Sequence, residues 1–385
     1  MKICVIAGEP SGDFLGSKLI EALKAQTVAE YSGVGGPLMI RAGQPSLFPY
    51  EELAVMGVAE IAPKLIGLLS RIRQTINHIK QTKPDVVVTI DSPDFCFRVA
   101  KAVKREMKSD APKIVHYVAP TVWAWREGRA QKIAKFLDGL ICLFDFEPPY
   151  FEFPSIAAGH PMAEGDALKA DGAVFREDNG VPNSETVIGL LFGSRKGELK
   201  RTGKILRDAA FNVADRMASL PQIVAPTLPH LRKDVHELLK GYRGEVHIIT
   251  DAGQKWNAFK SMDVALACSG TVGLELAMLQ IPHIIAYKMN PLTFEILKHV
   301  VKVKYAHLAN IMADREVVPE FIQGDCKVSD IADTAFNLLM SPDQQKHAFA
   351  DIAARLGAGQ KETPSQKAAA FVLDIAKRDS SLRSE

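Results

Sequence analysis

Two carboxylate-bearing segments in the first quarter of the chain each follow a short apolar run. Glu9 and Asp13 come after the run 3–7, and Asp91 comes directly after the run 86–90. In open α/β sheets, polar residues just past the carboxyl end of a strand face the ligand crevice. A carboxylate at Asp91 could take a proton from a substrate hydroxyl there, which makes it a candidate general base. The alternative is a turn-forming role ahead of the Ser-Pro pair that follows.

The segment after the first run reads Gly8-Glu9-Pro10-Ser11-Gly12-Asp13 and could line a sugar site. Carboxylates and hydroxyls accept hydrogen bonds from sugar hydroxyls, so Glu9, Ser11 and Asp13 are candidates for binding an acceptor. The glycine spacing is not the G-x-G-x-x-G of dinucleotide sites, and two carboxylates would repel a pyrophosphate. An ordinary strand, turn and helix with Asp13 near the helix cap is the other interpretation.

A second strand, turn and helix pattern begins at residue 186, and its loop is basic where the first loop is acidic. Gly193-Ser194-Arg195-Lys196 combines glycine, a helix start and fixed positive charge. Free N–H groups, the helix dipole and the two cations would together suit a diphosphate. The loop lacks the G-x-x-x-x-G-K-[ST] pattern of ATPases. A solvated basic turn would have the same composition.

A further candidate anion site follows the apolar run 264–267. Ser269 or Thr271 could cap the next helix beside Gly270 and also meet an anion there. Glu275, about one turn later, could accept hydrogen bonds from a ribose diol. Two helix starts suited to anions in the same half of the chain favour a nucleotide diphosphate as the ligand.

Two of the three tryptophans, Trp123 and Trp125, lie beside Arg126 at the end of a predicted strand. Tryptophans clustered at a cleft could stack on a sugar or line an acyl groove. Packing between a helix and the sheet explains the same spacing, so both interpretations stay open.

The stretch 63–80 places apolar residues on one helical stripe, with lysines and arginines elsewhere. The candidates for membrane contact on it are Leu65, Ile66, Leu68, Leu69 and Ile72. A basic amphipathic helix of this kind can lie at an anionic membrane surface. A stripe that faces the protein core has the same pattern. The stretch 291–305 is a second candidate.

Alternating apolar runs and helical stretches predict the elements that position these groups. The pattern occurs twice, in 1–164 and in 165–342, with a polar linker over 164–184. It predicts an α/β protein of two Rossmann-like domains, with the active site in the cleft between them. Residues 343–385 read as helix and are expected to pack back on one of the domains or on a partner chain. A length of 385 residues fits two domains.

Composition limits the classes of function. The formal charge of +2 argues against non-specific binding of nucleic acid. Five scattered cysteines with no C-x-x-C pair indicate a reducing, cytosolic protein without a zinc site. No signal peptide and no membrane-spanning run are expected. The sequence has no D-x-D, H-E-x-x-H or G-x-S-x-G motif, so neither a metal nor any other cofactor is predicted.

Collinear motifs between residue 3 and about residue 323 resemble the lipid-A-disaccharide synthase family. These motifs are Ala-Gly-Glu-Pro-Ser-Gly-Asp (7–13), Gly-Val-Gly-Gly-Pro (33–37), Met-Gly-Val (56–58), Asp-Ser-Pro-Asp-Phe (91–95), Val-Trp-Ala-Trp-Arg (122–126), Gly-His-Pro (159–161), Gly-Ser-Arg (193–195) and Ser-Gly-Thr-Val-Gly-Leu-Glu (269–275).

The resemblance implies a GT-B glycosyltransferase that needs no metal and inverts the anomeric centre. Its substrates would be UDP-2,3-diacylglucosamine and 2,3-diacylglucosamine 1-phosphate (lipid X), and its products the β-1′,6-linked tetraacyl disaccharide 1-phosphate and UDP. By motif position, Asp91 matches the base for the acceptor 6-hydroxyl, and Arg195 matches an arginine needed for activity. Glu275 and Asn310 match residues near the nucleotide sugar. The family is peripheral on the cytoplasmic face of the bacterial inner membrane, and some members dimerise by exchanging C-terminal segments.

Three positions depart from the family pattern, in which proline is usual. They are Phe192, Ala309 and Asp145. The charged and small residues of the motifs remain, so the activity expected from the resemblance is retained. Two other hypotheses are a UDP-sugar 2-epimerase on the same fold and a non-catalytic protein that binds UDP-sugars or lipids.

Overall fold

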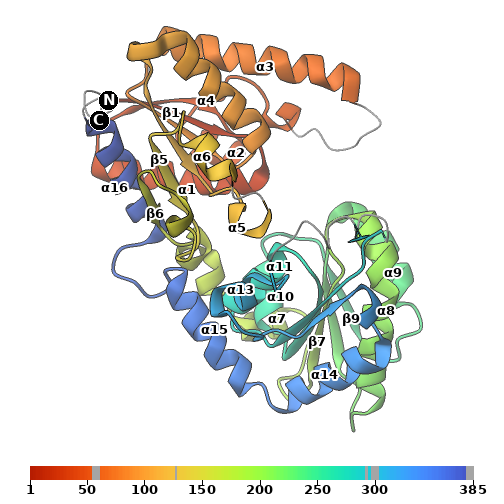
Figure 1. The fold of residues 1–385 in the computed structure, drawn as a ribbon. Coiled ribbons are helices and arrows are strands. Elements are labelled where there is room, and N and C mark those ends of the chain that lie inside the picture. Colours follow the sequence, from red (N-terminus) through yellow and green to blue (C-terminus); the bar gives the residue numbers. More distant parts are fainter. Residues whose placement is uncertain (54–60, 126–127, 291–293, 296–302, 379–385) are drawn as a thin grey trace. The chain divides into compact units, whose positions relative to one another are not determined.

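The computed structural model describes residues 1–53, 61–125, 128–290, 294–295 and 303–378, without the side chains of 61–66, 124 and 125. The chain divides into two compact units, Met1–Pro161 with Gly359–Glu385, and Met162–Ala358. Figure 1 shows each unit as a sheet covered by helices, as the α/β prediction requires. Of the described helices, none combines the length and the apolar character needed to cross a membrane.

The first unit is built on a six-stranded parallel sheet in the order β2-β1-β3-β4-β5-β6. Its strands are β1 Lys2–Ala7, β2 Glu30–Val34, β3 Val86–Ile90, β4 Lys113–Tyr117, β5 Gly139–Cys142 and β6 Ser155–Ala157. Every residue of β3 is buried, because helices cover both faces of the sheet and a Val/Ile-rich run fits such a central strand.

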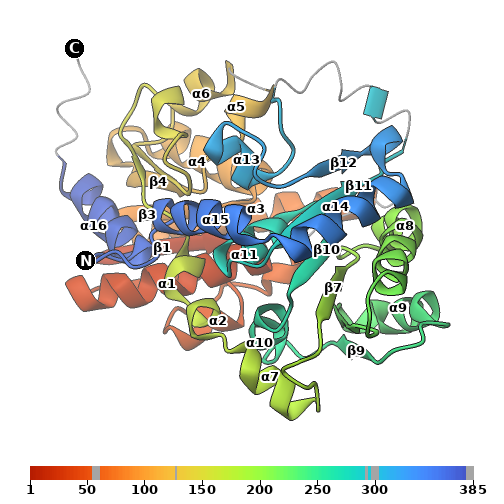
Figure 2. The same cartoon turned by 90° about the horizontal axis from the view of Figure 1, so that it is seen from below.

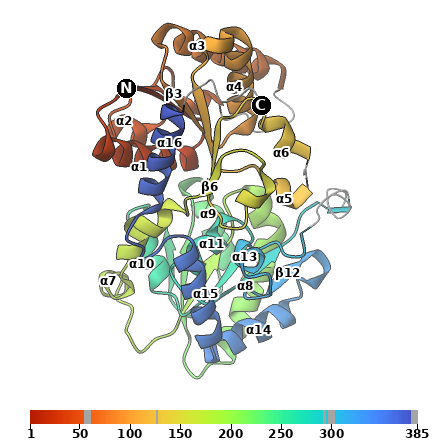
Figure 3. The same ribbon diagram turned by 60° about the vertical axis from the view of Figure 1, so that its left-hand side comes forward.

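Helices before and after the strands cover this sheet. They are α1 Pro10–Gln26, α2 Pro37–Arg41, α3 Ile61–Thr82, α4 Pro93–Met107, α5 Val122–Trp125, α6 Gly128–Ile133 and α16 Pro364–Lys377. Helix α3 packs on α4, and α16, from the far end of the chain, packs on α1 (Figure 3). The C-terminal helix therefore lies on the first unit of its own chain. A dimer formed by exchange of this segment stays a prediction.

The second unit repeats this plan with the strand order β12-β11-β10-β7-β8-β9, most of which can be followed in Figure 2. Its strands are β7 Val187–Leu191, β8 Gln222–Pro226, β9 Val246–Ile249, β10 Val264–Cys268, β11 His283–Tyr287 and β12 Glu320–Ile322. The described helices are α7 Gly172–Asp178, α8 Lys196–Asp215, α9 Arg232–Leu239, α10 Lys255–Lys260, α11 Thr271–Met278, α13 Leu308–Ala313, α14 Val328–Met340 and α15 Asp343–Arg355. Helix α8 packs against α14, and α11 packs against α15.

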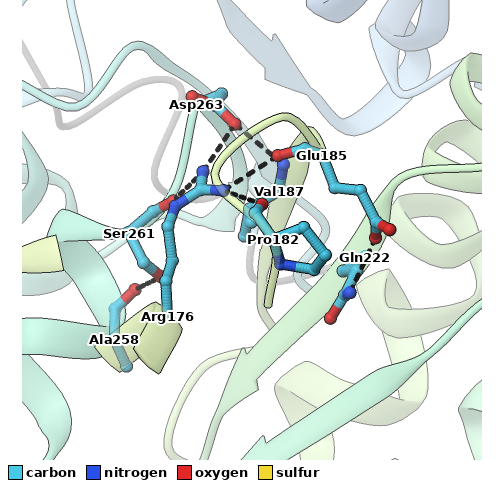
Figure 4. A network of polar contacts seen from close by, with 8 residues as sticks. All are labelled: Arg176, Pro182, Glu185, Val187, Gln222, Ala258, Ser261 and Asp263. Atoms are coloured by element: carbon cyan, nitrogen blue, oxygen red, sulfur yellow. Dashed lines mark hydrogen bonds and ion pairs between the residues drawn. The ribbon is translucent and has the colours of Figure 1, made fainter. Parts of the chain in front are cut away.

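A polar network around Arg176 fixes the start of this second sheet (Figure 4). The Arg176 guanidinium donates to the carbonyl oxygens of Glu185 (2.8 Å) and Ser261 (2.9 Å) and to Asp263 Oδ2 (3.1 Å). The same Asp263 oxygen accepts the N–H of Val187, the first residue of β7, at 2.8 Å. Much of the segment that reads as a linker is thus tied by hydrogen bonds into the second unit.

In each parallel sheet, the order in which successive strands are added reverses once, beside the first strand of that sheet. β1 lies between β2 and β3, and β7 lies between β8 and β10. Open α/β sheets bind ligands at such switch points, outside the carboxyl ends of the strands. The residues that follow β1 and β3, and those that follow β7 and β10, are therefore the positions at which ligand binding is expected.

Candidate active site

Glu9 and Asp91 lie at the switch point of the first sheet. Ala7, the last residue of β1, pairs with Ile90, the last residue of β3, so the loops carrying the two carboxylates start side by side. Asp91 and Ser92 both have positive φ, 50° and 41°. This left-handed conformation is uncommon outside glycine, and such strained residues cluster at functional sites.

The surroundings of this pair favour the protonated form of both carboxyls. Burial raises the pKa of Asp91, while hydrogen bonds from the Ser92 backbone and the Ser11 side chain act in the opposite direction. Burial also raises the pKa of Glu9, and the negative charge of Asp91 raises it further. A carboxylate with a raised pKa is a stronger base, so Asp91 is suited to accept a proton from a hydroxyl.

Asp13 lies apart from this chemistry. Its side chain is only 3% exposed, and its carboxylate accepts the N–H groups of Gly36, Leu38 and Met39, each at 2.9 Å. These are amides at the start of α2, so Asp13 stabilises that helix start through charge-assisted hydrogen bonds. The sequence places Asp13 among residues that face a sugar, whereas the structure gives it a buried structural role.

Trp123 is held by a carboxylate that the sequence does not single out. Its indole Nε1–H donates to Glu147 Oε1 at 3.2 Å, and its ring lies edge-on to Phe146. Glu147 is 2% exposed and also accepts the N–H groups of Leu143 and Phe144, both at 3.1 Å. Burial raises the pKa of Glu147 to about 7. Arg126 lies outside the described residues.

The apolar stripe of α3 divides into buried and exposed positions. Ile72 is 7% exposed and belongs to the core of the first unit, and Leu68 packs partly against that core. Leu69 is 49% exposed. The side chains of Leu65 and Ile66, and most of the stretch 291–305, lie outside the described part of the chain.

The second sheet has a cavity of about 560 Å³ at the carboxyl ends of its strands. Its lining comes from the loops after β7, β8, β9 and β10 and from Tyr287 at the end of β11. The predicted nucleotide-binding residues among the lining are Gly193, Ser194, Arg195, Ser269, Gly270, Thr271 and Glu275. The structure therefore brings together six of the seven residues proposed for the nucleotide sugar, with the catalytic candidate Arg195 beside them. The seventh, Asn310, is not part of the lining.

The loop after β7 does not offer its amides to a ligand as its sequence suggests. Glu198, a buried residue of α8, accepts the N–H groups of Ser194 (3.0 Å) and Arg195 (3.2 Å) through Oε2. Gly193 has a φ of 87°, and a Cβ there would lie 2.4 Å from the same Glu198 oxygen, so only glycine fits. The Arg195 side chain remains 65% exposed at the cavity, and its guanidinium lies 3.7 Å from Glu198 Oε1.

The start of α11 supplies the other anion-binding features of the cavity. Gly270 and Thr271 lie where the first N–H groups of this helix have no intrahelical acceptor, whereas the N–H of Ser269, just before the helix, donates to Ala286 O at 3.3 Å. Glu275 pairs with Lys255, whose Nζ lies 2.7 Å from Oε2 and 2.8 Å from Oε1. Lys255 also lines the cavity, and sequence reasoning missed it because no motif surrounds it.

Asn310 is fully buried, with 0% of its surface exposed, and is not part of the cavity lining. Its Nδ2 donates to Val318 O and Glu320 Oε1, both at 2.7 Å, and its Oδ1 accepts the N–H groups of Val317 and Val318. All of its hydrogen-bonding capacity is therefore used within the chain. Asn310 fixes the segment between α13 and β12.

Two of the three departures from the family pattern are buried. Phe192 (1% exposed) packs in the core of the second unit, and Ala309 (0%) is enclosed in α13. Asp145 lies exposed in the loop after β5. Among the described residues no group of three or more His, Cys, Asp or Glu side chains could hold a metal ion.

Comparison with solved structures confirms the fold. The UDP-GlcNAc 2-epimerase of Neisseria meningitidis, solved with UDP-GlcNAc, superposes with a TM-score of 0.69 over 97% of this chain and 100% of that chain, at 12% sequence identity. The MurG protein of Acinetobacter baumannii gives a TM-score of 0.60 over 97% and 99%, at 13% identity. Both likenesses extend over both units, and at these identities they show the fold alone.

Comparison of sequences identifies the family. The model of the lipid-A-disaccharide synthetase family matches residues 3–373. The lipid-A-disaccharide synthase of Rhodospirillum centenum is 42% identical over 97% of this chain and 94% of that protein. The enzyme of the same name from Azotobacter vinelandii is 35% identical over 98% and 99%. This chain therefore belongs to the lipid-A-disaccharide synthetase family and is a glycosyltransferase with the GT-B fold.

Proposed function

We propose that this chain transfers 2,3-diacylglucosamine from UDP-2,3-diacylglucosamine to the 6-hydroxyl of lipid X, with inversion. The products are the β-1′,6-linked tetraacyl disaccharide 1-phosphate and UDP. The observation that carries the proposal is the family match along residues 3–373, since relatives named lipid-A-disaccharide synthase span nearly the whole chain. The acidic switch point of the first sheet supplies a candidate base, and the cavity of the second sheet brings Arg195, Lys255 and the start of α11 together, which are groups of the kinds this reaction needs.

On the acceptor side, Asp91 takes the proton of the 6-hydroxyl as its oxygen attacks the anomeric carbon of the donor. The raised pKa of Asp91 supports this role, because a stronger base is better matched to a hydroxyl. Glu9 lies close enough to Asp91 for the negative charge of Asp91 to raise the pKa of Glu9. The Ser11 hydroxyl donates a hydrogen bond to Asp91. We assign Glu9 and Ser11 to orienting the acceptor and the base.

On the donor side, the cavity at the carboxyl ends of the second sheet receives the UDP group. The exposed Arg195 guanidinium and the free N–H groups at the start of α11 neutralise the charge that builds up on the departing diphosphate. The carboxylate of Glu275 has acceptor capacity for a ribose diol beside its pairing with Lys255. Asn310 acts indirectly, by holding its segment in place.

Inversion follows if the hydroxyl attacks the face opposite to the departing UDP. General-base catalysis typically contributes about 10²–10⁴-fold to such a step. Charge stabilisation at the leaving group contributes a comparable or larger factor. No metal takes part in the proposed reaction, as the family resemblance implies.

We further propose that the protein works as a peripheral enzyme on the cytoplasmic face of the inner membrane, where its acylated substrates reside. The exposed Leu69 on α3 supports this placement, because an apolar side chain beside basic ones favours an anionic lipid surface.

The direct test incubates the purified protein with UDP-2,3-diacylglucosamine and lipid X in the presence of EDTA. We expect stoichiometric release of UDP and disaccharide 1-phosphate. Asp91→Asn and Arg195→Ala should each lower turnover by at least about 100-fold in proteins that remain folded. UDP-GlcNAc alone should stay unchanged. Its epimerisation, or binding of UDP-sugars without any turnover, would contradict the proposal.

A further inference from the structure

A groove between α4 and α6 in the first unit is lined mainly by positive charge. It has a volume of about 670 Å³ and is separate from the site described above. Its cations are Arg98, Lys101, Arg129 and Lys132, its rings are Phe97 and Phe136, and Asp94 is the one carboxylate among the lining residues that the structure describes. We call this feature the α4/α6 groove.

The floor of the α4/α6 groove is rigid and apolar. Phe97 and Phe136 are 6% and 4% exposed, and their rings meet edge-to-face at 5.6 Å. The Arg129 guanidinium lies 5.3 Å from the centre of the Phe97 ring, and Lys101 Nζ lies 5.0 Å from the centre of the Phe136 ring. Cation–π contacts of this kind hold two of the positive charges over fixed rings.

The four cations of the groove are not paired with any carboxylate that the structure describes. Within the described residues, no ion pair to a carboxylate is formed by the four cations, whereas neighbouring Lys104 pairs with Asp138 at 2.7 Å. Like charges gathered in one concave surface repel one another and focus a positive potential outward. An anion bound in the groove would remove that repulsion, so the arrangement favours an anionic ligand.

The groove begins close to the proposed base. Asp94, which lines it, follows Asp91 by three residues, so their Cα atoms are at most about 10 Å apart. From Asp94 the groove extends along α4 to Lys101, a helical rise of about 10 Å. A sugar whose hydroxyl lies at Asp91 can therefore place an anionic substituent in this groove.

We propose that the α4/α6 groove binds the phosphate monoester of the acceptor and selects acceptors that carry it. This rests on the proposed function, in which the acceptor is a sugar 1-phosphate. A phosphate monoester carries about −1.5 to −2 charge at neutral pH, and two arginines offer it paired N–H donors. Leu69, the exposed apolar residue of α3, is not among the lining residues, which favours the substrate over a lipid headgroup as the occupant.

The test compares lipid X with the same diacylglucosamine lacking its phosphate, for the wild type and for the double variant Arg98→Gln/Lys101→Gln. Both side chains are exposed, so the variant is expected to fold. We expect the wild type to prefer lipid X, and the double variant to lose at least about tenfold of that preference through the KM for lipid X. The KM of the double variant for the UDP-sugar should stay at the wild-type value. Lys135→Gln, an exposed cation outside the groove, is the matched control and should retain the preference.

Two outcomes would overturn the inference. They are no preference of the wild type for the phosphorylated acceptor, and an unchanged preference in the double variant. If the variant that keeps the preference also loses co-sedimentation with phosphatidylglycerol vesicles, the groove is assigned to membrane headgroups. If the wild type releases no UDP at all, the proposed function fails, and calorimetric binding of lipid X and its phosphate-free form to wild type and variant still decides the inference.

Discussion

Glu9 and Asp91 follow neighbouring strands of one sheet, and the negative charge of Asp91 raises the pKa of Glu9. Burial raises the pKa of each carboxyl as well. Two interacting carboxyls titrate as a pair, and this pair retains a proton to higher pH than exposed carboxyls would. The same environment that makes Asp91 a better base also makes its charged form costly to bury.

This cost gives a prediction for activity and stability together. Asp91→Asn should lower kcat by about 10²–10⁴-fold and raise the free energy of unfolding at pH 8. The folded-state pKa of Asp91 lies above its unfolded value near 4, so its ionisation destabilises the fold as pH rises through the folded value. The gain in the variant should vanish near pH 4. Urea unfolding at pH 8 and pH 4 measures this gain in the free energy of unfolding. Asp110→Asn, at an exposed carboxylate, is the control. A variant less stable than wild type at pH 8 would contradict this.

Glu147 gives a second pH-dependent prediction. Its folded-state pKa of about 7 exceeds the unfolded value near 4.3, so the folded state binds the extra proton between these values. Wild-type stability should therefore fall as pH rises from about 5 to above 7. Glu147→Gln removes this titration and should flatten that part of the Tm profile, whereas the exposed Glu152→Gln should leave it unchanged. If the Tm of wild type and of Glu147→Gln changed with pH in the same way, the loss of stability could not come from the titration of Glu147.

Two glycines four residues apart along the chain should respond in opposite ways to the same substitution. Gly193→Ala places a Cβ 2.4 Å from Glu198 Oε2 at a φ of 87°, so it should cost about 1–3 kcal/mol and raise the KM for the UDP-sugar. Gly197→Ala, inside α8, meets only the flexible end of Arg201 at 3.2 Å and should be neutral or stabilising by up to about 1 kcal/mol. Chemical unfolding and donor titrations compare them. Equal effects would mean that Glu198 does not shape the loop.

Two residues of the apolar stripe on α3 can tell membrane contact from core packing, because Leu69 is exposed and Ile72 is buried. Leu69→Glu should weaken co-sedimentation with anionic liposomes by about tenfold or more, because a half-exposed apolar contact is lost, while the fold stays intact. Ile72→Glu should instead destabilise the protein by about 3 kcal/mol or more, because it buries an unpaired charge. Liposome binding and urea unfolding of both variants distinguish the two roles. Unchanged liposome binding by Leu69→Glu would remove α3 from the membrane proposal.

Most strands could be predicted because their residues carry the information locally. β3 Val86–Ile90 coincides with the predicted run 86–90, and β10 Val264–Cys268 with the run 264–267 to within one residue. Both are apolar runs rich in residues that fit a buried parallel strand. β6 and β12 could not be found, because Ser155–Ala157 and Glu320–Ile322 are too short to show a pattern. Their neighbours in the sheet, rather than their own sequence, define them.

Some residues of the candidate site could likewise be predicted from the local sequence, whereas their contacts with distant segments could not. Glycine, a helix start and an arginine identify the loop at Arg195 from its composition alone. The partner of each carboxylate could not be predicted, because it depends on distances between segments far apart in sequence. Asp13 binds amides of α2 more than twenty residues away, and Glu147 binds the indole of Trp123. Asn310 is identified by the family resemblance, yet all the hydrogen bonds of its side chain stay inside the chain.

The bonds from Glu198 to Ser194 and Arg195 have a consequence for the cost of binding the donor. An anion fixed within the chain already holds these amides, so the loop keeps its shape when the cavity is empty. Little conformational entropy remains to be lost when the nucleotide arrives, and such preorganisation leaves more of the contact energy available. The loop therefore needs no refolding before a nucleotide sugar binds.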